Sequence, residues 1–225
     1  MKAVRAMMAA QNNADWYAMM WDLRDLRYTR DAQGFRAMGP PPPYHGWATL
    51  VPGAAVEELI TPLLDKPGFA VKDGSGMHDL TGLGLVPMFT AQWLWYDGAA
   101  GAPTDRWEQV TTTADLAAWE EAWNASSPSD QRQFPDGILD RADVRLWGRK
   151  CDRGFDAGLI ANLSQGCVGL SNCFGQGARN PATALCAQFG QGRPVVGYER
   201  GEDLKEALNF GWQAVGPLTV WVKPG

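Results

Sequence analysis

The residue types that could bind an anion lie together in one glycine-rich segment, Phe174-Gly-Gln-Gly-Ala-Arg179. Gly175, Gly177 and Ala178 have little or no side chain, so the backbone there can approach a phosphate closely. Arg179 could add a charge-assisted contact. A helix is expected directly after the segment, and the unpaired N–H groups at a helix N-terminus attract anions. The alternative is a glycine-rich turn that only leads into that helix.

A thiol precedes this segment, in Ser171-Asn-Cys173. A thiol nucleophile needs an adjacent base such as histidine. The chain has only two histidines, His45 and His78, and both lie in its first half. A buried, unreactive thiol at Cys173 is therefore the default interpretation.

The cysteines as a group do not suggest a metal site, because they include no Cys-x-x-Cys pair and two histidines are too few for a histidine-rich site. We therefore expect no bound metal. Their apolar neighbours favour small, buried hydrophobic side chains instead. All four lie in the last third of the chain: Cys151, Cys167, Cys173 and Cys186.

The composition excludes several classes of protein. The chain has 225 residues, 45% of them hydrophobic, with 11 tryptophans, which is typical of a folded core and not of disorder. A net charge of −5 without clustered Lys or Arg argues against binding to nucleic acid. The apolar stretches are shorter than the ~20 residues that a membrane span needs. The apolar run after Lys2 and Arg5 is too short for a signal peptide, so we expect a cytoplasmic protein.

The elements that would position the glycine-rich segment can be read from residue 106 onward. Three consecutive strands separated by Gly-containing turns predict an antiparallel meander. A helix from Thr113 or Asp115 precedes it, and two further strand–helix steps follow it. The predicted ranges are a strand at 106–112, strands at 144–147, 157–163 and 167–174, a helix at 181–189, a strand at 194–198, a helix at 202–210 and a strand at 217–222.

The first part of the chain repeats the end of this pattern. A small-residue Gly/Pro stretch at 97–105 suits a linker between the two parts, 1–96 and 106–225. An amphipathic helix is expected at 15–28, ahead of the repeated elements. Those elements are a strand at 45–51, a helix at 55–64, a strand at 69–72, a short helix at 77–83 and a strand at 88–96.

The C-terminal residues resemble a known family. Residues 195–216, Val-Val-Gly-Tyr-Glu-Arg-Gly-Glu-Asp-Leu-Lys-Glu-Ala-Leu-Asn-Phe-Gly-Trp-Gln-Ala-Val-Gly, are similar to the strand–helix–strand ending of GNAT-type acyltransferases. The resemblance covers about residues 106–223 and implies an α/β (α+β) fold with a GNAT-like mixed central sheet flanked by helices. The repeat over 45–96 implies a tandem arrangement, with a degenerate N-terminal half-domain of related topology.

The resemblance also implies a cofactor site. In GNAT acyltransferases the loop after the fourth strand holds the pyrophosphate of acetyl-coenzyme A (acetyl-CoA). Of the family pattern Gln/Arg-x-x-Gly-x-Gly/Ala this chain keeps only a Gly-x-Gly-Ala fragment, and Asn180-Pro181 directly behind it is a departure. The implied cofactor-binding residues are Cys173, Phe174, Gly175, Gly177, Ala178 and Arg179.

The expected catalytic acid is missing. The family often has a tyrosine on the last helix that returns a proton to the leaving thiolate, and this position falls at Ala207. The nearest titratable candidates for catalysis are Tyr198 and Glu199. Glu199 could take the proton that an amine of pKa ~10 must lose before it attacks. Strand alternation puts the two side chains on opposite faces, and a solvated Glu199 beside a packed Tyr198 is the alternative.

Two functions follow from these observations. One is an acyl-CoA-dependent N-acetyltransferase that acts on a small-molecule or peptide amine and gains its rate mainly by positioning. The other is a non-catalytic binding or structural protein that keeps the fold, since fold alone does not fix function. The final strand at 217–222 lacks the partner of a complete family member. We expect a strand of the N-terminal part to fill that place, or a second subunit in a homodimer.

Overall fold

A computed structural model describes residues 1–98, 101, 106–125, 131–152, 154–164 and 166–224. The chain forms two compact units: Met1–Trp95 with Tyr198–Gly225 (unit 1), and Tyr96–Gly197 (unit 2). The last helix and the last strand thus belong to the unit of the N-terminal residues. The predicted linker at 97–105 lies mostly outside the described residues.

Unit 2 contains the predicted meander. β7, β8 and β9 pair antiparallel in sequence order, and β6 pairs antiparallel with β7 at the outer edge. β10 is parallel to β9, with Val195 opposite Val168 and Val196 opposite Gly169, and continues into unit 1 from Tyr198. The strands of this sheet are β6 (Trp107–Gln109), β7 (Val144–Cys151), β8 (Gly154–Ser164), β9 (Cys167–Phe174) and β10 (Val195–Glu199).

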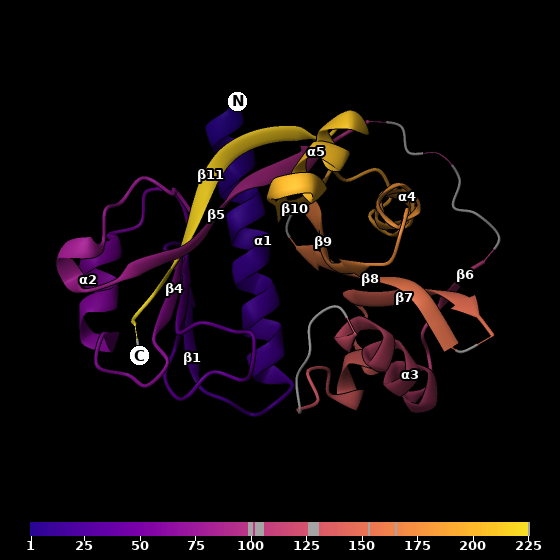
Figure 1. The fold of residues 1–225 in the computed structure, drawn as a ribbon, viewed down its shortest axis with the longest axis horizontal. Coiled ribbons are helices and arrows are strands. Elements are labelled where there is room, and N and C mark those ends of the chain that lie inside the picture. The colour runs from indigo at the N-terminus through magenta and orange to yellow at the C-terminus, as the bar shows by residue number, and fades with distance from the viewer. Residues whose placement is uncertain (99–100, 102–105, 126–130, 153, 165, 225) are drawn as a thin grey trace. The chain divides into compact units, whose positions relative to one another are not determined.

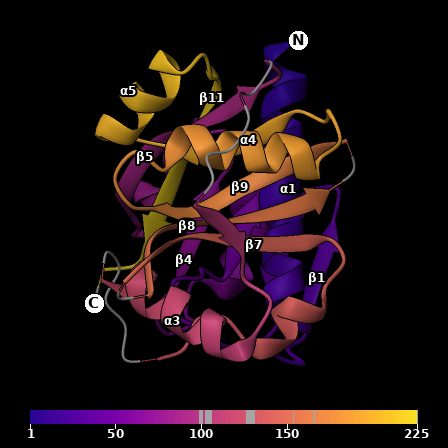
Figure 2. The same cartoon turned by 90° about the vertical axis from the view of Figure 1, so that its right-hand side faces the viewer.

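Two helices cover this sheet, α3 (Thr113–Asn124) on one side and α4 (Arg179–Phe189) on the other, as Figure 2 shows. Thr112 caps α3 by accepting a hydrogen bond from the backbone N–H of Asp115. A short 3-10 turn, η3 (Asp136–Asp140), lies between α3 and β7 in the chain. The described residues of the uncharged stretch at 157–171 are largely buried in β8 and β9.

The strands of unit 1 also pair in a mixed arrangement. β3 and β4 are parallel, and the other neighbours are antiparallel. β11, the final strand, lies between β4 and β5, so strands of the N-terminal part are its partners, as predicted. The strand order is β1 (Tyr28–Asp31), β2 (Gly34–Ala37), β3 (Ala48–Leu50), β4 (Ala70–Asp73), β11 (Gln213–Val222) and β5 (Val86–Tyr96).

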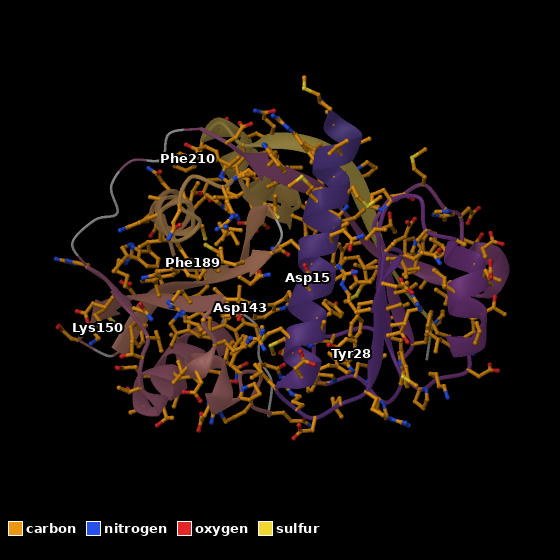
Figure 3. All side chains as sticks on the ribbon, turned by 180° about the vertical axis from the view of Figure 1, so that it is seen from behind. Asp15, Tyr28, Asp143, Lys150, Phe189 and Phe210 are labelled. Carbon is orange, nitrogen blue, oxygen red and sulfur yellow. The ribbon has the colours of Figure 1, made fainter. Side chains whose placement is uncertain are left out.

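A long helix, α1 (Lys2–Asp22), crosses this sheet and contacts β1, β2, β3 and β11 (Figure 1). Asp15, labelled on α1 in Figure 3, forms an ion pair with Arg30 of β1 at 2.7 Å. The remaining helical segments of unit 1 are α2 (Val56–Ile60), the 3-10 turns η1 (Thr61–Leu63) and η2 (Thr81–Leu83), and α5 (Gly201–Asn209). None of the described helices combines the length and apolarity that a membrane crossing needs.

Three predictions for the N-terminal part were wrong. The helix predicted at 15–28 runs from Lys2 to Asp22, because the Ala- and Met-rich start of the chain is strongly helix-forming and packs into the core. The hairpin of β1 and β2 was missed, since charged residues such as Arg30 and Arg36 weaken its strand pattern. The short helix predicted at 77–83 is only the 3-10 turn η2.

Candidate functional site

The glycine-rich segment forms the turn between β9 and α4, and its first glycine is fixed by packing. Gly175 has φ +92°, a conformation that disfavours side chains. A Cβ at this position would lie 2.3 Å from the backbone oxygen of Asp156 and 2.5 Å from the Cβ of Ala157. Gly175 is thus a structural requirement of the turn, which passes directly over β8.

The second glycine faces open space. Gly177 has φ +68° and is exposed, and among the described residues no heavy atom lies within 4 Å of the place that its Cβ would take. α4 begins directly after it, with Ala178 at the N-cap and no side chain capping the first turn. The N–H of Ala178 donates to the backbone oxygen of Gly175 at 3.3 Å, and the positive end of the α4 dipole faces an anion beside Gly177.

Arg179 was expected to add a charge-assisted contact to a phosphate, but the structure buries its side chain. Arg179 is 7% exposed and is the first residue of α4. Burial raises the pKa of the Cys186 thiol well above its usual value, and the positive charge of Arg179 partly offsets this shift. The side chain is thus directed into unit 2, and the part of Arg179 that belongs to the turn is its backbone N–H.

Cys173 and Phe174 end β9 on opposite faces of the sheet, as strand alternation requires. The Phe174 ring packs edge-to-face on Trp119 of α3, with ring centroids 5.1 Å apart. The half-buried Cys173 acts electrostatically on Cys186 of α4. Both side chains thus anchor the turn to the two helices.

The expectation of buried cysteines is correct for two of the four. Cys167 and Cys186 are buried, and Cys173 is intermediate. Cys151 is exposed, so the expectation is wrong there, because it ends β7 at the turn to β8.

Arg149 is a cation at the turn that the sequence did not reveal. Its Nη1 donates to the backbone oxygen of Gln176 at 3.3 Å, and its Nε pairs with Asp156 at 2.6 Å. It comes from β7, two strands away from β9, and only the strand pairing brings it to the turn. The turn therefore has an ion pair of Arg149 and Asp156 as its neighbour.

The two predicted catalytic residues lie at the end of β10, in unit 1. Tyr198 packs edge-to-face on Trp93, with ring centroids 5.6 Å apart. Burial, aided by the charge of Glu199, raises the pKa of Tyr198 to about 12. Such a phenol stays protonated, and proton transfer from it to a thiolate, whose thiol has a pKa of ~8.5, is uphill by about 3.5 pKa units. Glu199 is half-exposed.

Ala207, at the position where the resemblance places a tyrosine, is fully buried. Ala207 is 0% exposed within α5. A large polar side chain would not fit there without displacing its neighbours. The proton donor of the family pattern therefore has no equivalent at this position.

Both histidines have partners within unit 1. His45 Nδ1 lies 2.9 Å from the backbone oxygen of Pro43. His78 Nδ1 lies 3.0 Å from a carboxylate oxygen of the buried Asp73 and 3.1 Å from Ser75 Oγ. In the part of the chain that the structure describes, no three His, Cys, Asp or Glu side chains form a group that could hold a metal ion.

Comparisons with known proteins support the fold. No protein-family model and no curated protein sequence matches this chain. Among solved structures, one similar protein is assigned to the acetyltransferases of the GNAT family, from Novosphingobium aromaticivorans (TM-score 0.56, 13% identity, 92% of this chain and 94% of that chain). A conserved protein of unknown function from Staphylococcus epidermidis is also similar (TM-score 0.54, 9% identity, 75% and 77%).

A third similar structure is Saccharomyces cerevisiae N-myristoyltransferase with bound myristoyl-CoA (TM-score 0.55, 8% identity). The match covers 79% of this chain and 59% of that one. Identities this low show the fold alone. The chain has a GNAT fold: a mixed α/β structure with a large mixed sheet flanked by helices.

Proposed function

We propose that this protein is an acyl-CoA-dependent N-acyltransferase, and that the turn between β9 and α4 holds the pyrophosphate of the cofactor. The observation that carries the proposal is the open Gly177 directly before an N-terminus of α4 that no side chain caps. The GNAT fold supports it, because solved structures with this fold include a protein with bound myristoyl-CoA.

Each part of the turn has a distinct role in this proposal. Gly175 lets the chain turn tightly over β8, and Gly177 lets the pyrophosphate approach the backbone. The positive end of the α4 dipole and backbone N–H groups of the turn stabilise the phosphate oxygens. Arg149 contributes a guanidinium group beside the turn, paired with Asp156.

The cofactor supplies an activated acyl thioester. A neutral amine nitrogen of the acceptor attacks the thioester carbonyl carbon, the new C–N bond forms, and the C–S bond breaks. The amine loses one proton, and the departing thiolate takes one up. Because Tyr198 holds its proton tightly, we assign it no acid role. Glu199, which is half-exposed, is the candidate base for the amine proton.

A non-catalytic protein with the same fold is the second candidate function. Two observations favour it: the buried Ala207 where the resemblance places an acid, and the pKa of about 12 at Tyr198. A protein of this kind would keep the sheet and its helices but bind a partner without transferring an acyl group.

Calorimetric titration with acetyl-CoA separates the two candidates. Gly177→Glu places a carboxylate beside the bound pyrophosphate, and two like charges ~6 Å apart repel by about 0.7 kcal/mol even in water. Two phosphate charges therefore weaken binding about tenfold. Gly192→Glu is the matched control, because Gly192 has φ +84°, faces open space, and follows the C-terminal end of α4.

Binding that is weakened in Gly177→Glu and unchanged in Gly192→Glu supports the cofactor site. Equal affinity in both variants, or equal loss, contradicts it. If the unmodified chain does not bind acetyl-CoA at millimolar concentration, the non-catalytic function is favoured. If acetyl-CoA does bind, a screen of small-molecule and peptide amines identifies the acceptor, with release of the free thiol as the readout.

A further inference from the structure

Unit 1 contains a cavity of about 270 Å³ that the proposed function does not use. Its walls are mainly aromatic and aliphatic side chains from α1, the segment before β3, and the strands β4, β5, β10 and β11. None of the lining residues, all of which the structure describes, is Asp or Glu. The residues that matter below are Tyr17, His45, Lys72, Phe89 and Tyr198.

One lysine in this cavity, Lys72, is buried without a carboxylate as its ion-pair partner. Lys72 of β4 is 5% exposed, and its Nζ donates to Asn13 Oδ1 at 2.8 Å. The same nitrogen lies over the ring of Tyr198, 4.2 Å from its centroid, and 5.4 Å from that of Tyr17. Among the described residues no acidic side chain forms an ion pair with it. An ammonium group buried in this way is costly unless an anion joins it.

The groups that face Lys72 from the neighbouring elements do not supply that anion. Burial lowers the pKa of His45 to about 4, so its ring is neutral. Burial raises the pKa of Tyr17, and the pKa of Tyr198 is about 12, so both phenols are neutral. Asn13 is uncharged, and Phe89 is apolar. The positive charge of Lys72 therefore has no negative counterpart in the wall of the cavity.

We propose that this cavity binds a small molecule that carries a carboxylate on an apolar or aromatic body. The carboxylate accepts a charge-assisted hydrogen bond from Lys72 Nζ. The apolar body packs among the rings of Tyr17, Phe89 and Tyr198. A pocket that is mainly apolar, with a few polar groups that fix the orientation, is the usual form of a small-molecule site.

The size of the cavity limits the ligand. A volume of about 270 Å³ equals that of roughly nine water molecules at ~30 Å³ each. An aromatic acid or an amino acid fits into this space, whereas a nucleotide or a long acyl chain does not. The carboxylate of 3-phenylpropanoate is separated from its ring by two methylene groups, which makes this acid a suitable probe.

Calorimetric titration of the full chain with 3-phenylpropanoate and with its uncharged amide tests the proposal. The acid is expected to bind at least about tenfold more tightly than the amide. Lys72→Met and Lys72→Gln remove the charge, and the preference for the acid is expected to disappear in both. Lys205→Met is the matched control, because Lys205 is an exposed lysine of the same unit and pairs only with Glu202 among the described residues.

The pH dependence provides a second readout. Burial lowers the pKa of Lys72 from its ordinary 10.5. The affinity for the acid is therefore expected to fall as the pH rises through this lowered pKa, while the affinity for the amide stays constant. His45 and the two tyrosines keep their protonation states between pH 6 and pH 9, so they do not imitate this effect.

Three results would overturn the proposal. They are equal affinity for acid and amide, a preference for the acid that survives Lys72→Met in a folded variant, and no binding of either probe at millimolar concentration. Thermal unfolding of each variant shows that it is folded. Failure of the acetyl-CoA titration leaves this test unchanged, because the cavity and the turn before α4 belong to different units.

Discussion

Replacing Lys72 by methionine should stabilise the protein. The pKa of Lys72 is lowered by burial, which means that the folded state pays a net cost to keep the ammonium charged. Methionine has a similar length and no polar atom, so it fills the same space. Asn13 Oδ1 keeps the hydrogen bond from Thr49 Oγ1 at 3.1 Å, so no buried acceptor is left without a partner.

The expected gain follows from opposing contributions. The substitution loses a hydrogen bond from a charged group, which contributes about 1.5–3 kcal/mol, and a cation–π contact with Tyr198 of about 2 kcal/mol. It removes a desolvation penalty of several kcal/mol. Since the lowered pKa shows that the penalty is the larger effect, we expect the free energy of unfolding to rise by about 1–3 kcal/mol near neutral pH.

This difference should depend on pH with a defined sign. Between the lowered pKa of folded Lys72 and the ordinary lysine pKa of 10.5, the unfolded chain binds more protons at residue 72 than the folded chain does. The stability of the unmodified protein relative to Lys72→Met therefore rises with pH, by at most about 1.4 kcal/mol per pH unit. The advantage of the variant is largest below the lowered pKa of Lys72, falls as the pH rises from there to 10.5, and is constant above that pH.

Urea unfolding of both proteins at pH 7 and pH 10 measures this effect. The tyrosines of the unfolded chain titrate in this range, but they contribute equally to both proteins and cancel in the difference. The reasoning is refuted if Lys72→Met is less stable than the unmodified protein at pH 7, or if the difference between the two proteins is the same at both pH values.

Three further comparisons by urea unfolding test contacts within unit 2. The buried Glu120 carboxylate accepts hydrogen bonds from two backbone N–H groups of the following loop. Glu120→Ala should therefore lower the free energy of unfolding by about 2–3 kcal/mol, whereas replacing the exposed Glu121 by alanine should leave it nearly unchanged. Equal losses in the two variants would contradict this. Gly175→Ala should cost more than Gly177→Ala, because only the first meets a backbone oxygen at 2.3 Å. Thr112→Ala should cost about 1 kcal/mol through loss of the α3 cap, and an unchanged stability would count against that cap.

The C-terminal half of the fold could be predicted because its signals are local. The strand predicted at 167–174 has the bounds of β9, and the helix and strand predicted after it differ from α4 and β10 by two residues or fewer at each end. Gly turns and short apolar runs define these elements without help from distant residues. The order of elements then suffices to identify the GNAT fold.

The N-terminal part depends on packing that the sequence does not display. α1 is buried over most of its length, including Ala6, Ala9 and Ala10, so its first turns lack the polar face that marks an amphipathic helix. The sequence indicates a solvated lysine at position 72, within a strand, whereas the fold buries it against Asn13 of α1 and Tyr198 of β10. The same limit holds for Arg149, which reaches the turn through strand pairing alone.

The position of the turn between β9 and α4 could be predicted from the sequence, whereas its packing could not, and its role as a binding site stays a prediction. The glycine pattern indicates an anion-binding turn, yet the sequence does not distinguish Gly175, which packs on β8, from Gly177, which faces open space. It also gives no sign that Arg179 is buried. The distance of a Cβ to its neighbours is a property of the folded chain, so only the structure makes these distinctions.

Amide hydrogen exchange of the full chain with and without acetyl-CoA tests the central claim most directly. If the cofactor binds at the turn before α4, the amides of Gly177 and of the first turn of α4 should exchange more slowly in its presence, and this protection should be lost in Gly177→Glu. Slower exchange confined to other segments, or no change at saturating acetyl-CoA, would contradict the assignment of this turn as the cofactor site.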